Sequence, residues 1–220
     1  MTENIRKHLD TLLSRYKKLE VCEVQIIRAY EEIEKTYLAG GKLLITGNGG
    51  SAADSEHVVG ELMKAFVLPR RLPQEMEKKL KEIEPDLGAV LAERLQGALP
   101  SIALNGHPAL TTAYMNDCEP LLCFAQQVNG YGKPEDVLLG ISTSGNSKNI
   151  LYAAVIAKAK GMKVIGLTGA RESRLSALAD VTIQVPETET YMIQELHLPV
   201  YHCLCLMLEE RFFGNAEEKE

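Results

Sequence analysis

The chain has 220 residues, 45% of them apolar, and a formal net charge of −6 at pH 7. This is enough apolar content for one well-buried domain. No apolar run approaches the roughly 18 residues of a membrane span, and the charged N-terminus lacks the features of a secretion signal. Scattered Lys and Arg and few aromatic residues argue against nucleic acid as the main ligand. We therefore expect a single domain over residues 1–220 that binds neither membranes nor nucleic acid.

The first forty residues have the spacing of a helix. Apolar residues such as Leu9, Leu12 and Leu19 recur about every three or four positions, and Gly40 with Gly41 ends the stretch. The pattern predicts a continuous helix over residues 2–40, an N-terminal helical arm. Such an arm would lie across a neighbouring subunit or pack on its own domain.

Five short runs of β-type residues follow, and they are interspersed with helical segments. They are residues 42–46, 101–104, 136–141, 163–169 and 181–185. Strands that are apolar on both faces and alternate with helices form a parallel sheet covered on both sides. The sequence therefore predicts an α/β protein with three layers, in which helices flank a five-stranded parallel sheet.

Residues 73–98 differ in composition from the rest of the chain. They are dense in Glu and Lys at helical spacing, and Pro85 and Gly88 interrupt them. This pattern predicts two short helices or a bent one. The insert is either a solvated surface excursion or a lid over the ligand.

Two loops rich in glycine and hydroxyl groups follow predicted strands, and each leads into a helix. One is Gly47–Ser51 and the other is Ser142–Ser147. In open α/β sheets the ligand binds at the carboxyl ends of the strands. Helix N-termini present unpaired N–H groups there, and hydroxyls add neutral donors. The loops predict a site for a phosphate monoester, because neither has the pattern of a nucleotide-binding loop.

A histidine and a glutamate follow the first loop. His57 and Glu61 are four residues apart, so they share one face of a helix. A carboxylate and an imidazole suit an aldose–ketose isomerisation, in which one group removes a proton beside the carbonyl and another handles the sugar oxygens. Nitrogen and oxygen ligands also suit zinc. Taken alone, such a pair is more often an ordinary surface pair.

These motifs resemble the sugar isomerase (SIS) domain family, and within it the phosphoheptose isomerase branch. The resemblance rests on Gly47–Asp54 with His57 and Glu61, on Ser142–Ser147, and on Ile193–Glu195 with His197 and His202. It runs from about residue 1 to about residue 213, apart from residues 73–98. It implies a flavodoxin-like SIS fold and the conversion of sedoheptulose 7-phosphate to D-glycero-D-manno-heptose 7-phosphate.

The resemblance implies a role for each matching residue. Glu61 would be the catalytic base and His202 its partner acid. A possible Zn²⁺ would be bound by His57, Glu61, Gln194 and His202. The phosphate and the sugar would be held by Asn48, Gly49, Gly50, Ser51, Ser142, Thr143, Ser144, Ser147, Thr190 and Gln194. Spacing alone does not choose between His197 and His202, because Pro199 interrupts the helix, and the resemblance selects His202.

Three positions depart from the branch. Residues 105–107 read Asn-Gly-His where a Thr-Thr-Asp run is usual, Ala65 replaces an arginine, and Glu189 replaces an aspartate. These changes surround the sugar chain and leave the exact sugar open. The phosphate loops, Glu61 and His202 are retained, which favours an isomerase.

Two other functions fit the same loops. One is a non-catalytic phosphosugar-binding module with a regulatory or protein-partner role, and the other is a sugar-phosphate lyase with a different base. The branch also implies a homo-oligomer, either a tetramer or a dimer.

Five cysteines without a paired CxxC framework predict reduced thiols and a cytoplasmic protein.

Overall fold

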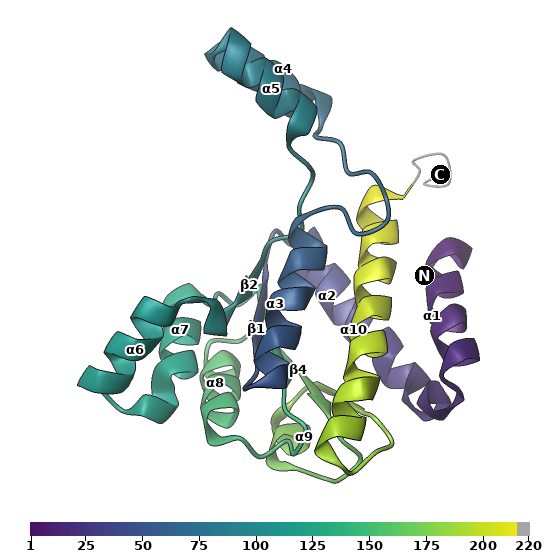
Figure 1. Cartoon of the computed structure of the whole chain (residues 1–220), viewed down its shortest axis with the longest axis vertical. Coiled ribbons are helices and arrows are strands. Elements are labelled where there is room, and N and C mark those ends of the chain that lie inside the picture. Colours follow the sequence, from purple (N-terminus) through teal and green to yellow (C-terminus); the bar gives the residue numbers. More distant parts are fainter. Residues whose placement is uncertain (215–220) are drawn as a thin grey trace.

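A five-stranded parallel sheet forms the centre of the molecule (Figure 1), in a computed structural model that describes residues 1–214. Its strands are β1 (Leu43–Thr46), β2 (Ser101–Ala103), β3 (Val137–Ile141), β4 (Lys163–Thr168) and β5 (Val181–Gln184). Their order is β2-β1-β3-β4-β5, and all neighbours are parallel. The five predicted strands and the parallel sheet are confirmed.

Helices cover both faces of this sheet, which gives the predicted three layers. One face packs against α2 (Glu23–Leu38), α3 (Gly50–Met63) and α10 (Thr190–Phe213). The other packs against α7 (Cys123–Tyr131), α8 (Lys148–Ala159) and α9 (Arg174–Leu178). Successive strand residues point to opposite faces, so Leu43 and Ile45 enter the first core and Leu44 the second. Both faces are buried, which explains the continuous apolar runs in the sequence.

The N-terminal segment is two helices rather than one continuous arm. The 3-10 helix η1 (Lys17–Cys22) separates α1 (Glu3–Arg15) from α2. The chain leaves helical conformation at Tyr16 (φ −126°, ψ 71°), because α1 packs on α10 while α2 packs against the sheet. The prediction of a continuous helix over residues 2–40 is therefore wrong. The apolar residues of α1, such as Leu9, are buried within their own chain.

The insert over residues 73–98 forms a helical hairpin that projects from the body (Figure 1). It consists of α4 (Gln74–Ile83) and α5 (Pro85–Arg94), so the prediction of two short helices is confirmed. Pro85 lies in the first turn of α5, where its missing N–H breaks no helical hydrogen bond. A Cβ on Gly88 would lie 2.1 Å from the carbonyl oxygen of Leu80, so glycine allows the two helices to meet closely.

The remaining elements complete the second layer after β2. They are η2 (Leu104–Gly106), α6 (Pro108–Asp117) and η3 (Pro120–Leu122). In the part of the chain that the structure describes, no helix combines the length and apolar character needed to cross a membrane.

Candidate active site

The helices α3 and α10 lie side by side and carry the predicted acid–base residues (Figure 1). His57 and Glu61 are on α3, and His202 is on α10. The helix α10 continues through Pro199, although proline leaves the carbonyl of Glu195 without its helical N–H partner. Most of α10 after this proline is buried, which fixes the helix against α3 and the sheet.

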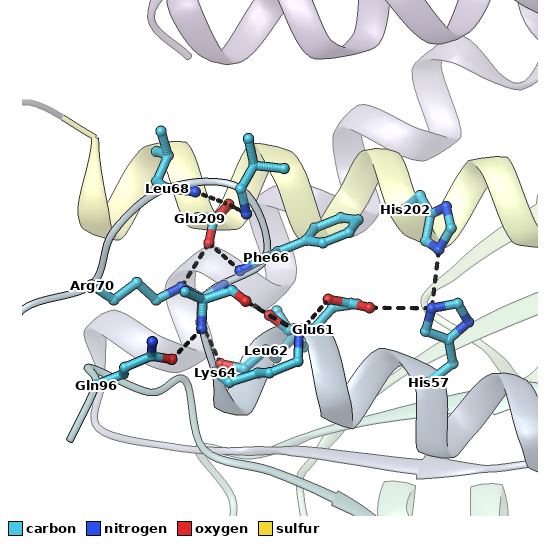
Figure 2. Close-up of polar contacts among 12 residues, drawn as sticks. His57, Glu61, Leu62, Lys64, Phe66, Leu68, Arg70, Gln96, His202 and Glu209 are labelled. Atoms are coloured by element: carbon cyan, nitrogen blue, oxygen red, sulfur yellow. Dashed lines mark hydrogen bonds and ion pairs between the residues drawn. The ribbon is translucent and has the colours of Figure 1, made fainter. Parts of the chain in front are cut away.

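His57 connects Glu61 with His202 (Figure 2). The Nε2 atom of His57 lies 3.2 Å from Oε1 of Glu61 and 3.3 Å from Nε2 of His202. The side chain of Glu61 is 13% exposed and that of His57 is 41% exposed, so solvent or a ligand can approach the group from the His57 side. The structure thus brings the predicted base and the predicted acid to one atom, within one chain.

Burial and neighbouring charged groups act on His202 and Glu61. Burial lowers the pKa of His202 and so does the neighbouring His57, whereas Glu61 acts in the opposite direction. The net effect favours the neutral ring of His202. Lys64 donates to Oε2 of Glu61 at 3.2 Å. Lys64 thus places a cation beside the carboxylate. The next residue, Ala65, occupies the position where the branch that the sequence resembles usually has an arginine.

The Nδ1 side of His57 contacts Tyr201, which in turn contacts Asp54, and neither residue was predicted from the sequence. The hydroxyl of Tyr201 lies 3.1 Å from Oδ1 of Asp54 and 3.1 Å from Nδ1 of His57. Burial raises the pKa of Asp54, although the hydrogen bond from Tyr201 and the nearby His57 act to lower it. Asp54 is the last residue of the Gly47–Asp54 motif, but the sequence predicted no role for its side chain. A signal was present, because Asp54 lies three residues before His57 and Tyr201 directly precedes His202.

A buried ion pair ties the chain after α3 to α10 (Figure 2). Nε of Arg70 donates to Oε1 of Glu209 at 2.8 Å, and both side chains are at most 1% exposed. The same carboxylate accepts the backbone N–H groups of Phe66, Val67 and Leu68 at 2.8–3.1 Å. Burial by itself would raise the pKa of Glu209, but these four hydrogen bonds bring the pKa below its ordinary value.

The guanidinium of Arg70 also holds the end of α3. It donates to the carbonyl oxygens of Leu62 at 2.6 Å and Glu61 at 2.8 Å. These carbonyls belong to the last turn of the helix and have no partner within it. Arg70 and Glu209 lie outside the family motifs and were not predicted from the sequence. No local signal marked Glu209, which begins a run of three charged residues with Glu210 and Arg211.

The predicted phosphate loop Ser142–Ser147 follows β3 and starts α8. The hydroxyls of Ser142 and Ser147 lie 3.2 Å apart. Gly145 has φ +62°, and a Cβ there would lie 2.1 Å from Oγ of Ser173, so this turn requires glycine. The loop therefore gathers hydroxyl groups at the N-terminus of a helix, as the sequence predicted.

The first loop, Gly47–Ser51, is joined to the first turn of α8, which follows the second loop. The side-chain amides of Asn48 and Asn149 exchange two hydrogen bonds, of 3.0 and 2.8 Å. Gln194 lies against the backbone of Gly50, where a Cβ would be 2.7 Å from its Nε2 atom. Gln194 of α10 thus contacts the start of α3 at Gly50, which lies seven residues before His57.

A cavity of about 260 Å³ opens beside the second loop. Its lining residues are Thr143, Ser144, Asn146, Gly169, Ala170, Arg171, Glu172, Glu187, Thr188, Thr190 and Ile193. Three of them, Thr143, Ser144 and Thr190, were predicted to bind substrate, and the cation of Arg171 was not. The first loop is not part of this lining, so the cavity lies on the side of the 142–147 loop that faces the start of α10.

Three of the four predicted zinc ligands, His57, Glu61 and His202, lie together. Within residues 1–214, no group of three or more His, Cys, Asp or Glu side chains is arranged to hold a metal ion. His57, Glu61 and His202 contact one another, and Gln194 lies beside Gly50. Zinc binding by these four residues therefore stays a prediction.

Comparison with known sequences places the chain among sugar isomerases. The SIS domain family matches residues 77–169. The chain is 36% identical over 210 residues to the phosphoheptose isomerase of Rhodospirillum rubrum, covering 96% of this chain and 98% of that protein. It is 33% identical over 219 residues to the phosphoheptose isomerase of Aneurinibacillus thermoaerophilus, covering 98% and 97%.

Solved structures give the same result. A phosphoheptose isomerase from Francisella tularensis has a TM-score of 0.73 at 30% identity and covers 96% of this chain and 100% of its own. The enzyme from Neisseria gonorrhoeae has a TM-score of 0.68 at 29% identity and covers 92% and 96%. The parallel sheet and the two loops define a SIS-domain protein. Within that class, the chain belongs to the phosphoheptose isomerase family.

Proposed function

We propose that the protein interconverts aldose and ketose forms of a phosphorylated sugar, and that it converts sedoheptulose 7-phosphate to D-glycero-D-manno-heptose 7-phosphate. The observation that carries this proposal is the meeting of Glu61 and His202 at the Nε2 atom of His57. Relatives named phosphoheptose isomerases match nearly the whole chain and support the choice of sugar.

The reaction assigns a separate task to each side chain. Glu61 removes the proton from the carbon beside the carbonyl, and the electron pair of that C–H bond moves into a carbon–carbon double bond to give an enediol. His202 donates its N–H proton to the carbonyl oxygen and takes a proton from the neighbouring hydroxyl. Glu61 then returns its proton to the other carbon. Every proton returns to the sugar, so no external acceptor is needed.

We propose that the phosphate is bound by the hydroxyls of the 142–147 loop and the N-terminus of α8. The cavity beside this loop carries further hydroxyls and the cation of Arg171, alongside the carboxylates of Glu172 and Glu187. Neutral hydroxyls and backbone N–H groups bind phosphate in a protein of net negative charge.

The test is turnover followed by NMR with a panel of ketose and aldose phosphates, with and without a chelator. Glu61→Gln should lower kcat about 10²- to 10⁴-fold, the range that a general base contributes, while substrate affinity changes little. Glu75→Gln, on the exposed hairpin, is the matched control and should keep full activity. Binding of the sugar phosphate without turnover by the wild type would instead support the non-catalytic binding module.

We propose a homo-oligomer, a tetramer or a dimer. Large apolar side chains on the projecting hairpin support association, because Ile83 is 82% exposed, Leu87 67% and Val90 53%. Light scattering at micromolar concentration should give a multiple of the 24.3 kDa chain mass. A monomeric mass would contradict this proposal.

We propose two further properties from the family resemblance. A Zn²⁺ ion would be bound by His57, Glu61, Gln194 and His202, and metal analysis of the purified protein tests it. A cytoplasmic location is supported by the five cysteines, all of which are free. Fractionation of the source cells tests the location.

A further inference from the structure

A second cavity lies at the base of the α4–α5 hairpin, between its helices and the segments that join them to the body. Its volume is about 580 Å³, against about 260 Å³ for the cavity beside the 142–147 loop. Small-molecule sites in proteins typically measure roughly 300–1,000 Å³. The described residues that line it all lie outside the acid–base group and both predicted phosphate loops, so this cavity is separate from the candidate active site.

The base of the hairpin is fixed to the body, which gives the cavity a preformed shape. Gly97 donates its backbone N–H to the carbonyl of Arg70 at 2.8 Å, so the two connecting segments are joined. The side chain of Gln96 accepts the N–H of Ala65 at 2.9 Å (Figure 2). Arg70 is held in turn by its buried ion pair with Glu209. A ligand would therefore meet walls that need little ordering on binding.

The cavity is lined by cations that have no partner, unlike other cations of the same hairpin. Lys78 and Lys79 each pair with a glutamate of α4. Lys81 stands four residues after Glu77, a spacing that suits an ion pair, but makes none. The cations of the lining that form no ion pair within residues 1–214 are Arg71, Lys81 and Arg94.

The lining has a small excess of positive charge. It contains two carboxylates, Glu77 and Glu93, and also Arg70, whose charge is already paired with Glu209. With that ion pair set aside, three cations face two carboxylates, in a chain whose net charge is −6. This local reversal of sign favours a negatively charged ligand.

The kinds of side chain in the lining indicate which anion fits. Arg71 and Arg94 are exposed, and guanidinium groups bind phosphate oxygens through paired N–H donors. Ala89, Ala92 and Leu95 add an apolar wall for the carbon part of a ligand. We propose that this cavity binds an organic phosphate, with its phosphate on the two arginines. The site goes beyond the proposed isomerase function and does not depend on it.

Calorimetry with adenosine monophosphate and glucose 6-phosphate tests the site. The titrations use protein that carries Ser144→Ala and Ser147→Ala, so that the proposed phosphate loop contributes little heat. At least one of the two compounds should bind, and more tightly than inorganic phosphate, which has no part that reaches the apolar wall. The affinity should fall as salt is added, because exposed charges are screened.

Two further double variants in this background locate the binding. Arg71→Ala combined with Arg94→Ala should weaken it at least about 10-fold, because two charge-assisted contacts to the phosphate are lost. Lys78→Ala combined with Lys79→Ala is the matched control. It removes the same charge from the same hairpin and should change the affinity less than about twofold.

Three outcomes would overturn the proposal. The first is no binding of either organic phosphate up to about 5 mM. The second is an affinity that the two arginine substitutions leave intact, which would place the ligand elsewhere. The third is an equal loss in the lysine control, which would show that only the net charge of the hairpin matters. Circular dichroism of each variant confirms that the fold is kept.

Discussion

Glu209→Gln should strongly destabilise the fold without changing the shape of the side chain. The carboxylate of Glu209 accepts four hydrogen bonds, from Arg70 and from the N–H groups of Phe66, Val67 and Leu68. A glutamine places an NH₂ group where one oxygen was, so donors face donors on that side. The charge of the buried Arg70 is left without its partner as well.

The expected loss follows from these contacts. Each buried donor left without an acceptor costs about 1–3 kcal/mol, and breaking a buried ion pair costs about 3–5 kcal/mol in total. We expect Glu209→Gln to lower the free energy of unfolding by about 3–5 kcal/mol. Urea unfolding followed by circular dichroism measures this loss. Glu75→Gln removes one partner of the exposed pair with Lys79 and should stay within about 0.5 kcal/mol.

The pH dependence gives a second check. The folded-state pKa of Glu209 is below its ordinary value of 4.5, so the stability it contributes is present above that value and is lost as the pH falls. The difference between the wild type and Glu209→Gln should therefore shrink below about pH 4.5. A loss under about 1 kcal/mol at pH 7, or a difference that does not depend on pH, would refute this account of the ion pair.

Three further outcomes can be checked directly. Ser144→Ala combined with Ser147→Ala should weaken sugar-phosphate binding at least about 10-fold in calorimetry, because two hydroxyl donors to the phosphate are lost. Burial lowers the pKa of His197 to about 4. Stability should thus fall between pH 6.5 and 4, by up to about 3 kcal/mol, and His197→Leu should remove this part of the acid sensitivity in urea titrations. Gly88→Ala should lower the melting temperature by clashing with α4, whereas Gly130→Ala, with open space at its Cβ, should not.

The sheet and the local motifs could be predicted because they are encoded by short-range patterns. Each strand is a short apolar run, and His57 and Glu61 share a helix face by spacing alone. The break at Tyr16 could not be predicted in this way. Apolar spacing continues through the 3-10 segment, and only the different packing partners of α1 and α2 separate the two helices.

The candidate site was only partly predictable for a related reason. Its second half lies on α10, and nothing local in that helix distinguishes His202 from His197, so the family resemblance was needed. The structure separates them, since His197 is fully buried while His202 contacts His57. Tyr201 and Arg70 act through hydrogen bonds to residues distant in the sequence or to backbone carbonyls, and spacing patterns do not report such contacts.

The geometry of α10 links catalysis to assembly. Thr190 lines the cavity beside the phosphate loop, and His202 follows it twelve residues later, roughly 18 Å along the helix at 1.5 Å per residue. An extended chain advances about 3.5 Å for every three bonds, so a heptose 7-phosphate spans roughly 9 Å from its first carbon to its phosphorus. One sugar is too short to reach from this cavity to the His202 of the same helix. Either the phosphate binds nearer to the start of α3, or the cavity of one subunit serves the acid–base group of another. The second arrangement requires an oligomer, so an active monomer would leave only the first.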